Sequence, residues 1–363
     1  MIRWRNGTVL ALGKSWRGAQ ELQVTLEAPE HGVEVRALAY PQLVGVAEPG
    51  DRVVLNVTAL AMGLGTGGYA MVVAIPDRLP PDAAGLERSC GHVVKARYTP
   101  LQVTMLGVDE QDSEHHETIA AADSIENMPV VIADLHSALP AILMGIRVDS
   151  PTARVSYVMT DGGALPIWFS RTVSELHEWL CGTVTVGQAF GGDADAVTLH
   201  SGLLAARHVQ RADIAIVTQG PGNLGTGTPW GFSGVAAGEA VNATTALGGR
   251  PIGALRISDA DPRGRHSGVS HHSTTAFGKV ALAAADLVIP EGLSEQLASA
   301  VAEDLAPLAS RHNVIHVSSA GLNTALAACP VKLSTMGRGL DADYAYFLAA
   351  AAAGRHAAAL LNS

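Results

Sequence analysis

The segment SDADPRGRHSGVSHH concentrates cationic and titratable side chains in the second half of the chain. Guanidinium groups bind phosphates and carboxylates through paired hydrogen bonds, and imidazoles exchange protons near neutral pH. We therefore expect an anion-binding part and an acid–base part in this segment. The first comprises Arg263, Arg265 and His266, and the second comprises His271 and His272.

A second segment, QGPGNLGTGTPWG, contains a formal match to the dinucleotide-binding pattern G-x-G-x-x-G. That motif needs a helix that begins within the glycines and an acidic residue roughly 20 positions later. Here Gly227 and Pro229 postpone the helix to about Ser233, and Asp259 lies 34 residues after Gly225, since 259 − 225 = 34. NAD and FAD are therefore not expected as cofactors.

The same glycine loop has a simpler interpretation. Glycines expose backbone N–H groups and let a ligand approach closely, and the hydroxyls of the loop add further donors. We expect this loop to bind a phosphate or carboxylate together with the arginines. The alternative is that its glycines serve only close packing. The expected loop residues are Gly220, Gly222, Gly225, Thr226, Gly227 and Thr228.

Polar side chains also follow other expected strands, and ligands of open α/β sheets bind at the carboxyl ends of strands. Asp134, His136 and Asp161 are expected to share the acid–base work with His271 and His272. Taken singly, Asp161 and Asp193 suit a helix cap equally well, and His136 suits a bond to a backbone carbonyl.

The sequence is also compatible with a divalent metal held by nitrogen and oxygen ligands, which suits zinc, manganese or iron. No fixed ligand spacing supports such a site. His271 and His272 are adjacent, so at a helix start they point about 100° apart, and we do not expect both on one ion. The candidate ligands are Asp134, His136, Asp161 and Asp193, completed by one of His266, His271 or His272.

Several catalytic motifs are missing from the sequence. It contains no G-x-S-x-G elbow and no lysine after the glycines to make a phosphate-binding P-loop. Its three cysteines form no CxxC pair, so no zinc knuckle is expected. An enzyme of hydrolase or transferase type and a non-catalytic ligand-binding or assembly protein both remain open.

The residues from 96 to 363 should form the elements that position these groups. Short apolar runs alternate with helix-length segments, the pattern of a doubly wound, mostly parallel α/β sheet. The expected strands are 129–133, 154–159, 183–186, 213–218, 251–257, 286–289 and 313–317. The expected helices are 165–180, 195–209, 235–247, 274–284, 294–311 and an Ala-rich terminal helix over 341–361.

Residues 1–95 follow a different pattern and should form a small all-β domain. Short runs rich in valine, leucine and threonine alternate with turn signals, as in a barrel or sandwich. The expected strands are 7–12, 21–27, 33–40, 52–58 and 69–75, and 76–91 should connect the two domains.

Composition narrows the class of protein. Hydrophobic residues make up 48% of 363, yet no run of about 18 uncharged apolar residues occurs, so no membrane span is expected. The formal net charge is −10 without a basic cluster, which argues against nucleic acid. The start resembles no signal peptide, so we expect a cytoplasmic protein. The apolar composition suits a homo-oligomer, and equally a monomer with a well-covered sheet.

The segments HSALP, MTDGGALP, AFGGD and RISDADPRGRHSGVSHH resemble those of an uncharacterised bacterial family of unknown function. The glycine segment QGPGNLGTGTPWGFSG and the N-terminal GDRVVLNVTALAMGLGTGGY are similar to it as well. The resemblance covers nearly the whole chain. It implies the two-part organisation and no particular reaction.

Overall fold

The computed structural model describes residues 1–82 and 91–362, so the connection expected over 76–91 lies partly outside the described residues. The chain forms two compact units. One consists of Met1–Thr104 with Trp168–Ser174, and the other of Met105–Ile167 with Glu175–Ser363. The domain boundary expected between residues 95 and 96 stays a prediction.

The first unit contains a closed five-stranded barrel in the order β1-β2-β3-β5-β4. Alternate residues of β2 point inward, and Leu22, Val24 and Leu26 are buried with Val9 and Leu55 in its core. This period of two is the pattern of a strand with one face on the core. The strands are β1 (Trp4–Trp16), β2 (Ala19–Leu26), β3 (Glu34–Ala39), β4 (Arg52–Asn56) and β5 (Ala70–Ala74).

The second unit is built on an eight-stranded sheet in the order β11-β10-β9-β12-β8-β13-β16-β17, in which every pair is parallel. The predicted α/β fold is therefore confirmed. The strands are β8 (Pro129–Ile132), β9 (Val155–Thr160), β10 (Gly182–Thr185), β11 (Ala194–Asp195), β12 (Ile214–Gln219), β13 (Arg250–Ala254), β16 (Asp286–Pro290) and β17 (Asn313–Val317).

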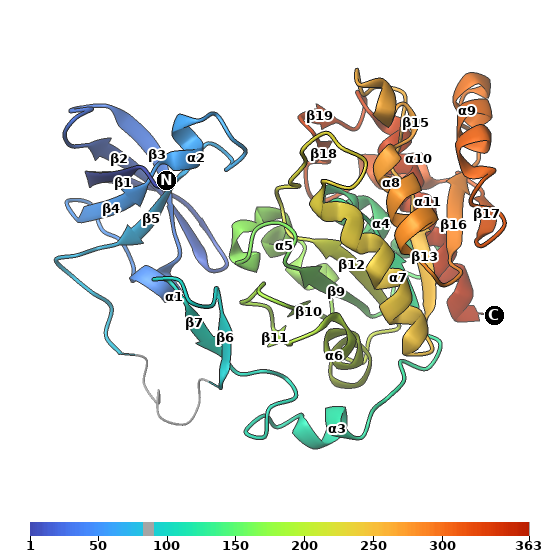
Figure 1. Cartoon of the computed structure of the whole chain (residues 1–363), viewed down its shortest axis with the longest axis horizontal. Coiled ribbons are helices and arrows are strands. Elements are labelled where there is room, and N and C mark those ends of the chain that lie inside the picture. The colour runs from blue at the N-terminus through green and yellow to red at the C-terminus, as the bar shows by residue number, and fades with distance from the viewer. Residues whose placement is uncertain (83–90, 363) are drawn as a thin grey trace. The chain divides into compact units, whose positions relative to one another are not determined.

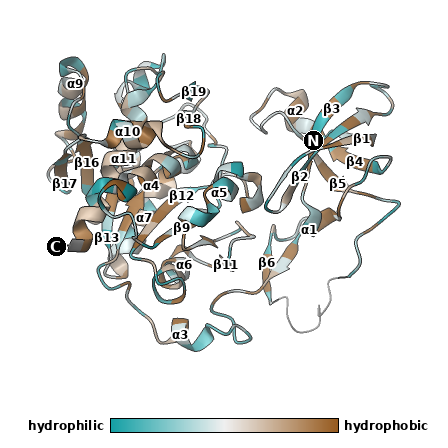
Figure 2. Cartoon of the chain, turned by 180° about the vertical axis from the view of Figure 1, so that it is seen from behind, coloured by the Kyte–Doolittle hydropathy of each residue, from teal (hydrophilic) through white to brown (hydrophobic). Residues whose placement is uncertain are grey.

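Helices cover both faces of this sheet (Figure 1). Helices α4 (Leu139–Asp149) and α11 (Tyr344–Ala359) pack against each other on one face, while α6 (Leu199–Leu204) and α7 (Ala236–Ala246) lie on the other. All residues of β8, β10 and β12 are buried, and the strands carry mostly hydrophobic residues (Figure 2). Strands buried on both sides explain the apolar composition.

The connections around β8 determine where a ligand can bind. The chain leaves β8 toward α4, whereas it leaves the neighbouring strands β12 and β13 toward α7 and α8 (His271–Thr275) on the opposite face. Helix α8 continues as a π-helical turn over Ala276–Val280 that packs on α7. Connections that diverge in this way open a crevice at the carboxyl ends of the strands.

Two of the expected helices differ most from the structure. The helix expected over 165–180 is broken into short turns around α5 (Arg171–Glu175), because Trp168 is buried in the barrel unit. The helix expected over 195–209 begins only at Leu199, because Ala194–Asp195 extends the sheet as β11.

Within the described part of the chain, none of the helices combines the length and apolar composition that crossing a membrane requires.

The remaining elements are short or peripheral. These elements are α1 (Pro41–Val44), α2 (Thr58–Ala61), α3 (His116–Ala120), α9 (Glu295–Leu305), α10 (Leu322–Ala327) and the strand pairs β6 (Val93–Lys95) with β7 (Val103–Met105), β14 (Ile257–Ser258) with β15 (Gly268–Val269), and β18 (Ser334–Thr335) with β19 (Arg338–Gly339).

Candidate active site

A cavity of about 220 Å³ lies at the crevice beyond β12 and β13. Three segments form most of it, namely the glycine loop after β12, the arginine-bearing turn between β14 and β15, and the start of α8, and Arg256 and Met336 complete the lining. The lining residues are Asn223, Gly225, Gly227, Thr228, Gly231, Phe232, Arg256, Arg263, Arg265, His266, His271, His272 and Met336. We call this cavity the arginine–histidine pocket.

The glycine loop folds back on itself as a small hairpin. The Thr226 amide donates to the Gly231 carbonyl at 2.7 Å, and the Gly231 amide donates to the Thr228 hydroxyl at 3.1 Å. Gly227 has φ +81°, a left-handed conformation that favours glycine. Its own polar groups therefore hold the loop in shape.

Three of the six expected loop residues line the pocket, namely Gly225, Gly227 and Thr228. Gly220 instead packs on a neighbouring turn, where a Cβ atom would lie 2.5 Å from the Ala164 carbonyl oxygen. Gly222 provides a turn at φ +94°, and the Thr226 hydroxyl lies 3.1 Å from that of Thr228 within the hairpin. Part of the loop thus serves packing and turn geometry, and part faces the pocket.

The three histidines of the arginine segment gather at one wall of the pocket. The ring centroids of His266 lie 4.9 Å from His271 and 5.0 Å from His272. Ser270 caps α8 by accepting from the His272 amide at 3.2 Å, and its hydroxyl lies 2.6 Å from His266 Nδ1. This hydroxyl therefore ties the turn before α8 to the first turn of the helix.

The expectation that His271 and His272 diverge is wrong. Their ring centroids are 4.5 Å apart at an interplanar angle of 70°. Phe232 stacks on His272 at 3.8 Å and meets His271 edge-on. Both rings thus line the same pocket, packed against Phe232.

Burial keeps two of these imidazoles neutral. Desolvation, followed by the positive charge of Arg256, lowers the pKa of His266 to about 3. Desolvation, followed by the influence of His272 and Arg265, lowers the pKa of His271 to about 4. At physiological pH each of these two rings therefore carries no charge and keeps one nitrogen lone pair.

Asp134 joins this cluster from the end of β8. Its side chain is 3% exposed, and its Oδ2 atom lies 3.3 Å from His272 Nδ1 without the alignment of a hydrogen bond. The side-chain amide nitrogen of Gln219, Nε2, donates to the Asp134 backbone carbonyl at 2.7 Å and to Asn223 Oδ1 at 2.9 Å. Gln219 therefore links the end of β8 to the glycine loop.

The arginines of the site differ in what they contact. Asp261 accepts from Arg263 at 2.8 and 2.9 Å, and Arg256 and Arg338 each approach it at 3.3 Å. Arg265 forms no hydrogen bond or ion pair with any described residue. The arginine free for a ligand is thus Arg265, whereas the expected partner Arg263 is committed to Asp261.

The neighbourhood of the pocket carries excess positive charge. Asp343 pairs with Arg338 at 2.8 Å and accepts from Ser258 at 2.8 Å. Four arginines, 256, 263, 265 and 338, thus face three carboxylates, 134, 261 and 343, which leaves 4 − 3 = 1 positive charge. An anion is the ligand that such a pocket favours.

The other expected site residues lie elsewhere. His136 Nδ1 is 2.9 Å from the buried Tyr157 hydroxyl, and desolvation lowers the pKa of His136 to about 4. Asp161 is exposed and accepts from the Gln188 amide at 2.8 Å. Asp193 accepts from the Thr183 amide and hydroxyl, both at 2.8 Å.

Asp193 also borders a separate cavity of about 630 Å³ beside β10 and β11. The structure therefore does not bring the expected metal ligands Asp134, His136, Asp161 and Asp193 together. Of these four, Asp134 is the one that lies at the histidines.

Sequence reasoning missed several lining residues, above all Arg256 and Phe232. Arg256 is 3% exposed and lies within the otherwise apolar run PIGALRIS. A charged residue within an apolar run is a detectable signal, since arginine is almost never fully buried without a partner. Phe232 and Met336 carry no comparable signal.

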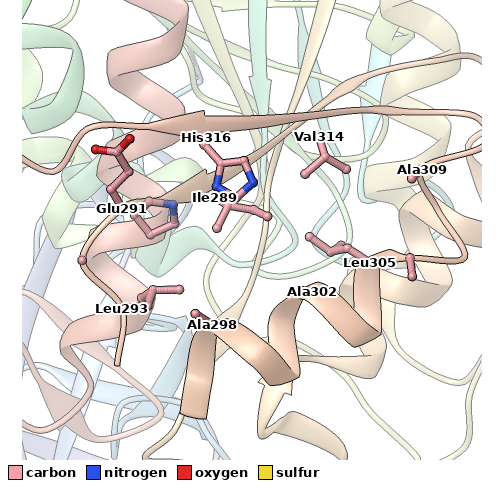
Figure 3. A pocket seen from close by; sticks show the side chains of 12 residues that line it. Ile289, Glu291, Leu293, Ala298, Ala302, Leu305, Ala309, Val314 and His316 are labelled. Carbon is pink, nitrogen blue, oxygen red and sulfur yellow. The ribbon is translucent and has the colours of Figure 1, made fainter. Parts of the chain in front are cut away.

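A further cavity of about 380 Å³ lies between α9 and the strands β16 and β17 (Figure 3). Its wall is mainly alanine, leucine, isoleucine and valine, with Glu291 and His316 at one end. It lacks a convergent set of polar groups, so the arginine–histidine pocket is the better candidate.

Comparison with known families agrees with the resemblance seen in the sequence. Residues 36–354 match the model of a family described as a protein of unknown function, DUF3866. The chain belongs to this family. A search among curated proteins found no match to the chain.

Proposed function

We propose that this DUF3866 protein is an enzyme, a hydrolase or transferase, acting on a small phosphate- or carboxylate-bearing substrate in the arginine–histidine pocket. The observation that carries the proposal is the convergence of Arg265, the glycine hairpin and three histidines on one cavity. This cavity combines anion-binding groups with groups able to move protons.

Binding of the substrate anion is assigned to Arg265 and to the backbone of Gly225 and Gly227. The Arg265 guanidinium has all its donors available to a ligand, and it can bind two oxygens of one phosphate or carboxylate at once. Glycines in the wall let those oxygens approach the backbone. Arg256 adds a buried positive charge at the same cavity.

The reactive groups are assigned to the histidine cluster. Asp134 lies behind His272, the arrangement in which a carboxylate orients an imidazole for proton transfer. Tyr157 holds His136 in the sheet, and Asp161 caps a turn, so in this proposal neither contacts the substrate.

Inorganic phosphate and a phosphate monoester are the first probes, with a small carboxylate as the alternative. A ligand that binds only the folded state increases the free energy of unfolding by RT ln(1 + [L]/Kd), and the melting temperature rises as a result. We expect phosphate to stabilise the full-length, chelator-treated protein, and Arg265→Ala to weaken phosphate binding by about tenfold or more. Arg265 is exposed, so the melting temperature without ligand should not change.

Arg207→Ala is the matched control, because Arg207 pairs with Glu126 near the opposite, amino end of the sheet. It should respond to phosphate like the wild type. An equal response of Arg265→Ala, or no response of the wild type to any of these anions, would refute the assignment. Binding without turnover of the ester would favour the non-catalytic ligand-binding alternative.

A further inference from the structure

The three pocket histidines present nitrogen atoms to a common point. One nitrogen or more from each of His266, His271 and His272 lies within 4.8 Å of the others. The Nδ1 atom of His266 is occupied by the Ser270 hydroxyl, so its Nε2 atom is the one that can face the group. Such a trio, with room beside it for a further ligand, has the composition of a catalytic zinc site.

Polar atoms at this point are buried and unsatisfied. Within residues 1–82 and 91–362, the four buried side-chain atoms without a hydrogen bond are Asp134 Oδ2, Gln219 Oε1, His271 Nε2 and His272 Nδ1. Three of the four thus belong to the histidine cluster and the carboxylate beside it. Asp134 Oδ2 and His272 Nδ1 lie 3.3 Å apart and can partner each other. His271 Nε2 has no such partner among the described residues, and because buried polar groups are nearly always paired in native proteins, this nitrogen indicates a missing cationic partner.

The chemistry of these atoms selects the partner. Imidazole nitrogens are common ligands of divalent transition metals, and a carboxylate behind a ligand histidine fixes its ring and increases its basicity. The 3.3 Å between Asp134 Oδ2 and His272 Nδ1 places the carboxylate there and leaves His272 Nε2 for the ion. Nitrogens bound to one tetrahedral zinc lie about 3.4 Å apart. Small rotations of the three side chains would bring their nitrogens from within 4.8 Å of one another to this distance.

We propose that His266, His271 and His272 bind one divalent transition-metal ion of the zinc type, and that Asp134 orients His272 from behind. This ion lies at the wall of the pocket to which the proposed function assigns substrate, and it would act on a bound anion as a Lewis acid. Metal binding itself does not depend on the proposed function, since it needs no substrate.

The test uses the full-length protein, stripped with a chelator and titrated with Zn²⁺ by calorimetry, and with Co²⁺ by absorption spectroscopy. We expect one Zn²⁺ per chain and cobalt bands typical of tetrahedral nitrogen coordination. His271→Ala should weaken Zn²⁺ binding at least about 100-fold, since it removes a ligand. Asp134→Asn should weaken it about 10- to 100-fold, as loss of an orienting partner does.

His200→Ala is the matched control, because His200 lies exposed on α6, outside the cluster. His271→Gln serves as a second variant if alanine disturbs folding, and circular dichroism of the metal-free proteins checks that fold. Absence of stoichiometric binding by the wild type, or equal affinity in folded His271→Ala or His271→Gln, would overturn the proposal. Phosphate stabilisation of the stripped protein reports separately on the proposed function, so the two can fail independently.

Discussion

The carboxylate of Asp261 lies among three arginines, 256, 263 and 338. Its contacts decide which guanidinium groups of the site remain available to bind a ligand. Its side chain is fully buried, and Arg256 beside it is 3% exposed. Hydrogen bonds from Arg263 hold the pKa of Asp261 well below its usual range. The buried Arg256 charge is stable in this position because a carboxylate faces it.

Asp261→Asn should therefore destabilise the protein strongly at pH 7. Removing one partner of a buried ion pair leaves an uncompensated charge, which costs about 3–5 kcal/mol. The measurement is urea-induced unfolding, compared between wild type and variant. Asp77→Asn is the control, because Asp77 pairs with Arg52 on the exposed barrel surface and should have little effect.

The pH dependence has a definite sign. A carboxyl group whose pKa is lowered by folding contributes stability above its unfolded pKa, near 3.9, and loses that contribution as the pH falls toward the folded value. The difference between wild type and Asp261→Asn should therefore be largest at neutral pH and should shrink below about pH 4. A difference that grows on acidification would contradict this account.

At the scale of elements, close packing of α4 and α11 supports the end of β8 that carries Asp134. A Cβ atom on Gly145 would lie 1.8 Å from the Ala351 carbonyl oxygen, and one on Gly354 would lie 2.0 Å from that of Ile142. The two helices thus cross with backbone against backbone. Tyr346 of α11 reaches the Ser137 hydroxyl at 2.8 Å, next to the site.

Gly145→Ala and Gly354→Ala should each lower stability by about 1–3 kcal/mol or more, because a methyl group overpacks an interface that has no space for it. Thermal and urea unfolding would measure this. Gly264→Ala is a suitable control, since its Cβ would meet nothing within 4 Å. If Gly145→Ala and Gly354→Ala were both as stable as the wild type, the two helices could move apart at no cost, which would contradict this account.

At the scale of the whole molecule, the chain returns to the barrel unit after it has entered the α/β unit. Trp168–Ser174 belongs to the barrel unit although it lies between strands of the large sheet in sequence. Trp16 Nε1 donates to the Trp168 carbonyl at 2.7 Å, and the Trp168 ring packs against Gly18. The two units therefore do not correspond to two continuous stretches of chain.

Trp168→Ala should loosen the barrel unit. Trp168 is 6% exposed, and truncation of a buried aromatic residue costs about 3–5 kcal/mol. Hydrogen exchange followed by mass spectrometry should show faster exchange in β1 and β2. Trp230→Ala, which removes a 57% exposed ring, should leave that exchange unchanged. Equal exchange in both variants would mean that the segment does not stabilise the barrel.

The sequence by itself determined the order of the elements and the end of the sheet at which the candidate site lies. Short runs rich in valine, leucine and threonine, separated by turn signals, predicted a barrel or sandwich, and the β17 bounds expected over 313–317 agree with the structure. Strand direction follows from the parallel fold, so Asp134 and the arginine segment had to lie at carboxyl ends. These properties depend on near neighbours in the chain, which a sequence pattern records.

Only the tertiary structure decided which side chains of that end meet. His136 turns to Tyr157 and Asp161 to the Gln188 amide, whereas Arg256 enters the pocket from within a buried run. Phe232 brings His272 to the cluster by stacking. Each orientation depends on a partner distant in sequence, because rotamers are chosen by the packing around them.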